Sequence, residues 1–378
     1  LERMAEEDYK IKFSLREKEE RYYKEKTKEF GLKTIDRFVR YVPNPSKYMR
    51  MNITFAHRDL ELIADAIANN KPWAVISGLN PSGPLHLGHK AVFDELLWMQ
   101  ENGSEIFIQI TNYESYVVGK TKSLAESRRI AYESVIPSII AMGFNAEKTH
   151  IFVDSDYLDI YNIAMDVSKK ITLNKIFKVF GLSESEEGEN PGTMFYRGAV
   201  QLAQNLLPQY EEFGGPKPTL VPVGIDQHPY ILLSRDVAER KGFIPPAELV
   251  LKFLWGLDGK GKMSASREDS MIFLTDEPNS VIKKLKRAYT GGSVLGDYQK
   301  EHGGIPEICP IGALRTYHFE LDNRINEQCS SGELLCGQCK KDTIEQVVEY
   351  LIDHQRKLPE ARKRIDEFLL RKPIKSIL

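Results

Sequence analysis

The chain has 378 residues and a net charge of −2, from 52 Lys and Arg against 54 Asp and Glu. This length allows two or three domains with a substantial core, and the near-neutral balance leaves any nucleic-acid contact to local patches. The sequence holds no apolar run of the roughly 20 residues that a membrane span needs. With four cysteines and no signal-like start, we expect a soluble protein of the reducing cytoplasm that contacts no membrane.

Residues 1–30 carry nine basic and nine acidic side chains. Opposite charges at helical spacing predict a solvated helix, and we expect it to extend into solvent. A second helix should run from Leu60 to about Asn70. Residues 1–70 are therefore interpreted as a charged N-terminal extension with a helical segment.

A strand, a tight turn and a helix are predicted over residues 73–103. The apolar run 73–77 is typical of a buried parallel strand, and the segment 78–84 is rich in Gly, Pro and Asn, as in a loop. The first turn of the helix holds His86, Gly88 and His89. A helix N-terminus attracts phosphate through its unpaired N–H groups and partial positive charge, so the segment indicates a nucleotide site. Capping and packing alone would explain the two histidines equally well.

Strand-like and helical segments alternate as far as about residue 280, which predicts the parallel sheet of an α/β fold. The further strands are expected in the short apolar runs 106–110, 149–154 and 219–223. Beyond Thr275 the alternation stops and helical patterns dominate. We therefore predict a Rossmann-like domain over residues 71–280, with an inserted helical region at about 122–195, and a helical domain over residues 281–378.

Residues 259–266, Gly-Lys-Gly-Lys-Met-Ser-Ala-Ser, form a polar and flexible segment after a strand-like run at 249–254. It carries one cationic arm, Lys262, and the hydroxyls of Ser264 and Ser266. By itself this is most simply a solvated basic loop. Paired with the earlier turn, it is typical of a mobile clamp on a polyphosphate.

Together, His86-Leu87-Gly88-His89 and Lys262-Met263-Ser264-Ala265-Ser266 resemble the two signatures of class I aminoacyl-tRNA synthetases. Within that class, several further segments resemble the tryptophanyl-tRNA synthetases of archaeal and eukaryotic type. These are Gln109-Ile110-Thr111 with Glu114, Gly224-Ile225-Asp226-Gln227, and the segments 272–276 and 332–340. The resemblance runs from about Phe55 to the C-terminal helices. It implies a Rossmann-like catalytic domain, a helical anticodon-binding domain, and a homodimer formed through the inserted region.

The implied reaction has two steps: the carboxylate of tryptophan attacks the α-phosphate of ATP, and the adenylate is then transferred to tRNA(Trp). Because the amino acid is the nucleophile, the protein's task is alignment and charge stabilisation. The implied catalytic residues are His86, His89 and Lys262. The implied ATP-binding residues are Gly78, Gly88, Thr111, Gly224, Asp226, Met263, Ser264 and Ser266. Mg²⁺ is expected with the ATP phosphates.

The resemblance also implies a polar pocket for tryptophan. Gln109 matches the position that accepts a hydrogen bond from the indole N–H. Glu114, Gln201 and Gln227 match positions near the α-ammonium. Such groups select a substrate, because a wrong side chain leaves them unpaired.

The chain departs from the family pattern in this pocket. The family's tyrosine on the first strand falls where this chain has residues 74–76, Ala-Val-Ile, and Tyr113 or Tyr116 is a candidate for its role. A basic residue expected after Glu114 is Ser115. The related tyrosyl enzymes carry an aspartate where this chain has Gln204, which favours tryptophan.

All four cysteines fall within 31 residues: Cys309, Cys329, Cys336 and Cys339. In a chain of cytosolic type such concentration indicates a metal rather than disulfides. Four thiolates suit a single zinc ion or a [4Fe-4S] cluster, and some tryptophanyl enzymes carry such a cluster with a similar terminal spacing. Thiols without metal are the alternative.

Three other functions stay open from the sequence. The chain could be a tyrosyl-type or other class I synthetase, a small-molecule adenylyltransferase with the same nucleotide fold, or a synthetase-like tRNA-binding paralogue without catalysis. The expected partners under the main interpretation are tRNA(Trp), tryptophan, ATP and a second copy of the chain.

Overall fold

The computed structural model describes residues 2–180, 190–261, 263, 267–293 and 295–377. Among these residues, seven strands form one sheet in the order β1-β2-β7-β6-β3-β4-β5. The strands are β1 (Lys33–Thr34), β2 (Thr54–Arg58), β3 (Ala74–Leu79), β4 (Glu105–Ile110), β5 (Thr149–Val153), β6 (Thr219–Gly224) and β7 (Ala247–Leu251). The five strands from β3 to β7 pair in parallel, as predicted. The sequence analysis missed β2, which extends this sheet by pairing antiparallel with β7 and with β1.

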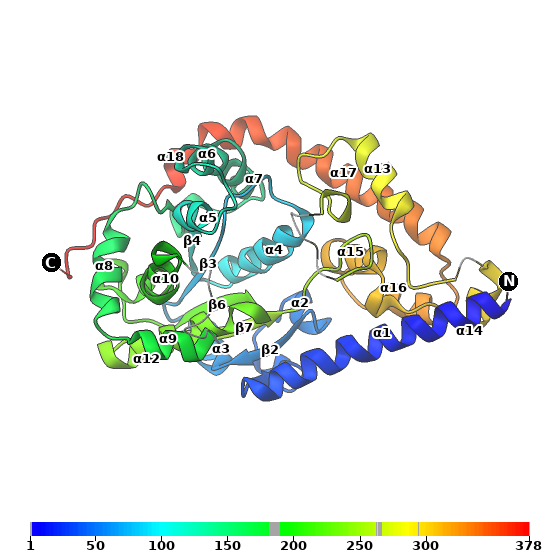
Figure 1. Cartoon of the computed structure of the whole chain (residues 1–378), viewed down its shortest axis with the longest axis horizontal. Coiled ribbons are helices and arrows are strands. Elements are labelled where there is room, and N and C mark those ends of the chain that lie inside the picture. Colours follow the sequence, from blue (N-terminus) through cyan, green and yellow to red (C-terminus); the bar gives the residue numbers. More distant parts are fainter. Residues whose placement is uncertain (1, 181–189, 262, 264–266, 294, 378) are drawn as a thin grey trace.

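Helices fill the connections between the strands and make up the C-terminal part (Figure 1). They are α1 (Glu2–Glu29), α2 (Lys47–Arg50), α3 (Leu60–Ala68), α4 (Leu87–Glu101), α5 (Asn112–Val117), α6 (Leu124–Ile130), α7 (Ile136–Ala141), α8 (Asp159–Ser168), α9 (Leu173–Phe180), α10 (Pro191–Phe195), α11 (Gln201–Leu206), α12 (His228–Lys241), α13 (Pro278–Arg287), α14 (Gly296–His302), α15 (Pro310–His318), α16 (Arg324–Ser330), α17 (Cys336–Lys363) and α18 (Ile365–Phe368). Two π-helical segments, η2 (Ala131–Val135) and η4 (Tyr196–Val200), lie within longer helical runs.

The sheet is buried on both faces, because successive side chains of a strand point to opposite sides. On β4, Ile106, Ile108 and Ile110 belong to one apolar cluster, whereas Phe107 belongs to another. The first cluster includes residues of α3, α4, α7, α15 and α17. The second includes residues of α8, α11 and α12. The predicted α/β architecture is confirmed.

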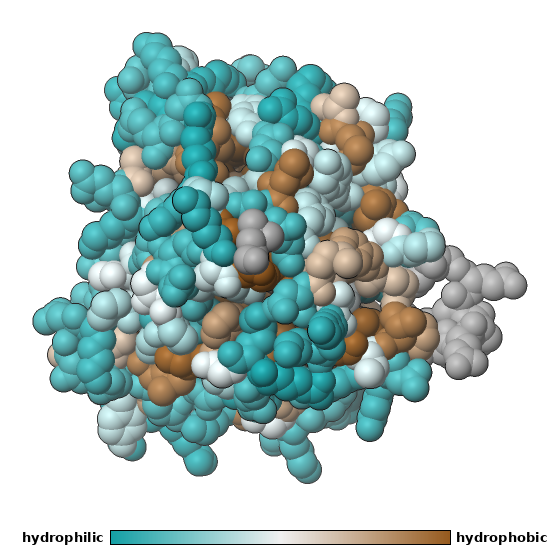
Figure 2. Space-filling model, turned by 90° about the vertical axis from the view of Figure 1, so that its left-hand side faces the viewer, coloured by the Kyte–Doolittle hydropathy of each residue, from teal (hydrophilic) through white to brown (hydrophobic). Residues whose placement is uncertain are grey.

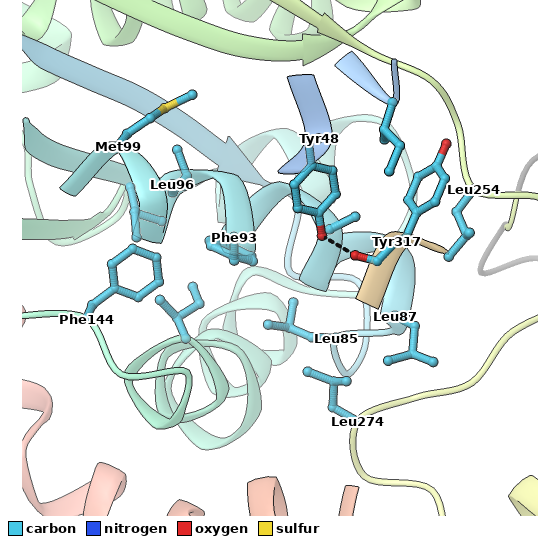
Figure 3. Packing of buried hydrophobic residues seen from close by; sticks show 14 of the residues in the cluster. Tyr48, Leu85, Leu87, Phe93, Leu96, Met99, Phe144, Leu254, Leu274 and Tyr317 are labelled. Carbon is cyan, nitrogen blue, oxygen red and sulfur yellow. Dashed lines mark hydrogen bonds between the residues drawn. The ribbon is translucent and has the colours of Figure 1, made fainter. Parts of the chain in front are cut away.

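The first apolar cluster joins the signature helix α4 to the C-terminal helices (Figure 3). Leu87, Phe93 and Leu96 of α4 are at most 3% exposed. Tyr48 of α2 donates a hydrogen bond to the carbonyl oxygen of Tyr317 in α15 (2.8 Å) and contacts Asp94 of α4 (3.0 Å). The helical C-terminal part is therefore packed directly on the helix that begins at the predicted nucleotide site. The predicted domain boundaries stay predictions.

Helix α1 does not extend freely into solvent, so that expectation is wrong. Tyr9 and Lys12 are buried, and they donate hydrogen bonds to the carbonyl oxygens of Gly303 and Gly292 (2.5 and 2.6 Å). Further along α1, Glu19 accepts from the indole N–H of Trp255 (2.8 Å). The residues that make these buried contacts are few and lie among many charged residues, so the sequence pattern did not predict the packing of α1.

The C-terminus also differs from the predicted helices. After α18 the chain is extended, and Leu370 donates its N–H to the carbonyl oxygen of Ile151 on the edge strand β5 (2.7 Å). The tail thus covers part of an exposed sheet edge. Among the described residues, no helix is both long and apolar enough to cross a membrane.

Candidate functional site

The predicted strand, turn and helix over residues 73–103 are confirmed as β3, a loop and α4. His86 is the N-cap of α4, and its Nδ1 accepts a hydrogen bond from the N–H of Gly88 (3.1 Å). His89 reaches back, and its Nδ1 accepts from the N–H of His86 (3.3 Å). The two imidazoles stack with their centroids 3.8 Å apart. The histidines therefore do cap the helix.

Capping also determines which ring nitrogen of each histidine carries the proton. Burial lowers the pKa of His86 to about 4 and the pKa of His89 well below its usual value, so both rings are neutral near pH 7. Because each Nδ1 accepts a backbone hydrogen bond, the proton of each neutral ring lies on Nε2. The helix start thus offers two Nε2–H donors in addition to its own N–H groups.

The two distant signature segments meet at this helix start. Leu87 donates its N–H to the carbonyl oxygen of Ile272 (3.0 Å), and Leu274 donates to that of Leu85 (2.7 Å). Met263 also lies here, since its sulfur would be 3.8 Å from a Cβ placed on Gly88. The predicted residues Lys262, Ser264 and Ser266 lie outside the described residues. Their neighbour Met263 is buried at the site, which supports the predicted convergence of the two segments.

A cavity of about 320 Å³ opens at the carboxyl ends of β3, β4 and β6. In the sheet, β4 lies on one side of β3 and β6 lies on the other, so the strand order reverses direction at this position. Open α/β sheets bind ligands at such a switch point. Seven of the predicted residues line it: Gly78, Gln109, Thr111, Glu114, Gln201, Gly224 and Gln227. Sequence reasoning missed Asn80, Lys120, Asn205 and Tyr230, which also line it and carry no motif.

Two glycines allow backbone and side chains to pack closely at this cavity. A Cβ on Gly78 would lie 2.0 Å from Cγ of Gln109, its partner in the β3–β4 register. A Cβ on Gly224 would lie 2.7 Å from the ring of Phe253. Asp226 follows in an exposed position and does not line the cavity.

The polar groups of the cavity are arranged to receive hydrogen-bond donors. Among the described residues, Oε1 of Gln109 and Oε1 of Gln201 are buried and accept no hydrogen bond. The amide of Gln201 donates instead to Oε1 of Gln227 (3.4 Å). Burial raises the pKa of Glu114, while Lys120 opposes the rise. Buried acceptors without a partner are costly, and these two would suit a ligand that carries N–H or O–H groups.

The two tyrosines considered for the missing aromatic role do not line the cavity. Tyr116 is 44% exposed, and Tyr113 packs its ring against Tyr161. Residues 74–76 are fully buried in the sheet. Of Gln109, Tyr113 and Tyr116, the three residues considered for the indole N–H, only Gln109 lines the cavity.

The four cysteines surround one small cavity, which Cys309, Cys329, Cys336 and Cys339 line together. Glycines stand against the sulfurs: a Cβ on Gly292 would lie 2.4 Å from Sγ of Cys336, and one on Gly304 would lie 2.7 Å from Sγ of Cys329. Burial and the neighbouring thiols raise the pKa of Cys339 to about 11. Within the described residues, however, no three potential ligands are close enough to hold a metal ion. The predicted metal site, with zinc or with a [4Fe-4S] cluster, therefore stays a prediction.

A Rossmann-like sheet, a histidine-capped helix at its switch point and a methionine-bearing segment folded against that helix agree with the class I aminoacyl-tRNA synthetase that the two signatures predict. The family model of class I tRNA synthetases (W and Y) matches residues 68–351. The chain is 39% identical to a tryptophan–tRNA ligase of Methanocaldococcus jannaschii, over 90% of this chain and 93% of that one. It is 36% identical to the corresponding ligase of Pyrobaculum calidifontis, over 88% of each chain.

Solved structures agree with this assignment. The tryptophanyl-tRNA synthetase of Aeropyrum pernix superposes with a TM-score of 0.83 at 33% identity, covering 93% of this chain and 96% of that one. The Plasmodium falciparum enzyme superposes with a TM-score of 0.79 at 30% identity, covering 92% and 97%. The chain belongs to the class I tRNA synthetase family of tryptophan and tyrosine type.

Proposed function

We propose that this chain is a tryptophan–tRNA ligase, which forms tryptophanyl-adenylate from tryptophan and ATP and transfers the tryptophan to tRNA(Trp). The observation that carries the proposal is a pair of buried amide oxygens, on Gln109 and Gln201, that accept no hydrogen bond from any described residue and lie in the switch-point cavity with the carboxyl group of Glu114. The two acceptors suit the indole N–H and the α-ammonium of tryptophan. The relatives described above are tryptophan enzymes, which supports the same choice.

The nucleotide end of the site would act by charge stabilisation. ATP would lie between the β3–α4 turn and the 224–226 segment, with Gly78, Gly88 and Gly224 leaving room for it and Thr111, Met263 and Asp226 alongside. The Nε2–H groups of His86 and His89 would donate to phosphate oxygens as negative charge develops. Lys262 would neutralise the leaving pyrophosphate, with Ser264 and Ser266 closing over it. Mg²⁺ would accompany the ATP phosphates.

Tyrosine is the nearest competing substrate, and Gln204 argues against it. A tyrosyl site needs a carboxylate for the phenol, at the position that Gln204 occupies. The nearby carboxylate, Asp154, already accepts hydrogen bonds from Gln204 and Tyr196, and it does not line the cavity. Among the described residues that line the cavity, Glu114 is the only carboxylate, and it is assigned to the α-ammonium and not to a phenol.

The direct test is exchange of labelled pyrophosphate into ATP with each of the twenty amino acids. We expect exchange with tryptophan at least a hundredfold faster than with tyrosine or phenylalanine. Exchange led by tyrosine would contradict the substrate, and tight tRNA binding without any exchange would favour the non-catalytic paralogue. Exchange without charging of tRNA would favour the small-molecule adenylyltransferase.

A homodimer would form through the surface of α8, α9 and α10. Leu158, Met165 and Leu173 are each more than 60% exposed there, and an apolar groove of about 350 Å³ runs between these helices. Figure 2 looks onto the side that carries α8 and shows hydrophobic patches among hydrophilic residues. Leu173→Glu should shift the sedimentation of a dimer to that of a monomer. Leu321→Glu, at a 73% exposed position outside this surface, should not.

The four cysteines would hold a [4Fe-4S] cluster rather than a zinc ion. The four thiols line one small cavity, and their terminal spacing resembles that of the tryptophanyl enzymes that carry such a cluster. Glycines beside the sulfurs of Cys329 and Cys336 allow the backbone to pack closely around these thiols. Gly312 donates its N–H to Sγ of Cys309 (3.4 Å), which makes Cys309 the N-cap of α15. About four iron and four sulfide per chain after anaerobic purification would support this, and stoichiometric zinc would contradict it.

These proposals place the protein in the cytoplasm, where charging of tRNA and buried reduced thiols are both expected.

A further inference from the structure

A buried polar cluster lies beside the amino-acid end of the cavity without lining it. Asp154, directly after β5, is fully buried, as are Gln204 of α11 and, to 3% exposure, Tyr196 of η4. Tyr196 donates its hydroxyl hydrogen to Oδ2 of Asp154. The amide of Gln204 donates to Oδ1 of Asp154 (2.7 Å) and to the hydroxyl oxygen of Tyr196 (2.7 Å).

This cluster bonds the first residue of the π-helical segment that precedes Gln201 and a residue of α11 that follows it. Tyr196 is the first residue of η4, and Gln201 follows its last residue. A π-helical turn contains one extra residue, which rotates everything after it by about 100° relative to an α-helix. The direction in which Gln201 points therefore depends on keeping the π-helical turn.

Gln204 continues the same face one turn beyond Gln201, because residues three apart on a helix are neighbours. Tyr196 and Gln204 both donate hydrogen bonds to the carboxylate of Asp154, directly after β5. The two ends of the helical segment 196–204 are therefore tied to the same residue. Gln201 lies between them in the sequence and lines the cavity, and its buried Oε1 has no hydrogen-bond partner within the described part of the chain. Asn205 on the next position is held separately by Ser234 (3.0 Å).

We propose that Asp154, Tyr196 and Gln204 are positioning residues for the amino-acid substrate, which fix the π-helical turn so that Gln201 meets the substrate's α-ammonium. The role of Gln201 rests on the proposed function, whereas the fixing of the turn does not. The cluster acts on amino-acid binding and not on ATP, because its hydrogen bonds connect Asp154, Tyr196 and Gln204 and include none of the residues assigned to ATP.

Tyr196→Phe removes one hydroxyl without changing the shape of the core. We expect the KM for tryptophan in pyrophosphate exchange to rise about tenfold, while the KM for ATP and kcat change less than twofold. The matched control is Tyr157→Phe, which removes a hydroxyl that donates to the carbonyl oxygen of Lys372 (2.7 Å) and does not line the cavity. The control should leave both KM values unchanged.

Asp154→Asn tests the cluster by conservative replacement. The new amide could donate to Oε1 of Gln204, which has no partner within the part of the chain that the structure describes, while its oxygen accepts from Tyr196. We expect Asp154→Asn to stay within threefold of wild type in the KM for tryptophan and Asp154→Ala to exceed tenfold. Equal effects of the two variants would contradict the bonding scheme.

Hydrogen–deuterium exchange separates the positioning role from the proposed function. Tyr196→Phe should speed exchange of the amides at 197–204 at least tenfold, and Tyr157→Phe should not. Unchanged exchange there, or equal rises in the KM for tryptophan and for ATP, would overturn the inference. If wild type activates another amino acid, the substrate assignment fails and the same comparison is made with that amino acid. If wild type activates none, the amide exchange decides the positioning role alone.

Discussion

Replacing Gln109 with Ala should weaken tryptophan binding by an amount that the structure allows us to estimate. The Oε1 atom of Gln109 is buried and has no hydrogen-bond partner among the described residues, so the protein gives up no existing bond when it accepts from the indole N–H. Removing it leaves that N–H buried and unpaired, which costs about 1–3 kcal/mol. The KM for tryptophan should therefore rise about 5- to 150-fold, and the KM for ATP should not change.

A substrate analogue makes this test specific. An alanine derivative that carries a benzothiophene ring in place of indole lacks the N–H, so Gln109→Ala should bind it as well as wild type does. Gln100→Ala is the matched control, because Gln100 is buried and bonded to Thr149 (2.8 Å) away from the cavity. Equal losses with tryptophan and with the analogue would refute the reasoning.

Three further perturbations have distinct expected results. His86→Asn and His86→Ala should each lower kcat for adenylate formation by about 10²- to 10³-fold. Only His86→Ala should also lose about 1 kcal/mol of stability, because asparagine can still cap the helix. A wild-type rate of His86→Asn in single-turnover assays would contradict this. Burial raises the pKa of Glu95 to about 8, so its contribution to stability is full below pH 4.5 and is lost as the pH rises toward 8. The free energy of unfolding in urea should therefore fall between pH 5 and pH 8 in wild type, and fall less in Glu95→Gln. Equal falls in the two proteins would argue against this. The hydroxyl oxygen of Tyr23 accepts a hydrogen bond from the N–H of Phe253 (3.1 Å), whose ring packs against Gly224. Tyr23→Phe should therefore raise the KM for ATP about threefold and leave the KM for tryptophan unchanged. A rise in the KM for tryptophan alone would be inconsistent with this contact.

The sequence predicted those parts of the fold and site that depend on neighbours in the chain. The run 73–103 contains its own strand, turn and cap signals, and the structure has β3, the loop and α4 there. The parallel strands could be predicted from the sequence because both faces of each strand are buried, which requires a continuous run of apolar residues. Seven cavity residues were found through motifs whose spacing is local.

Features that depend on tertiary contacts were not predictable in this way. Strand β2 is a short segment that acquires its role only by pairing with β7, almost two hundred residues later. Lys120 lines the cavity from a loop without any pattern. The hydrogen bonds among Asp154, Tyr196 and Gln204 join three separate elements, and each residue by itself resembles an ordinary core or surface position. The π-helical turn that gives this cluster its importance has no known signature in the residues of η4.

Charging of tRNA tests the central claim most directly. Purified protein, ATP, Mg²⁺ and labelled tryptophan should convert a tRNA transcript with the tryptophan anticodon to its aminoacylated form, and labelled tyrosine with the same transcript should give less than one hundredth of that rate. Transfer of tyrosine at the higher rate, or no transfer of either amino acid to this transcript or to one with the tyrosine anticodon, would contradict the account.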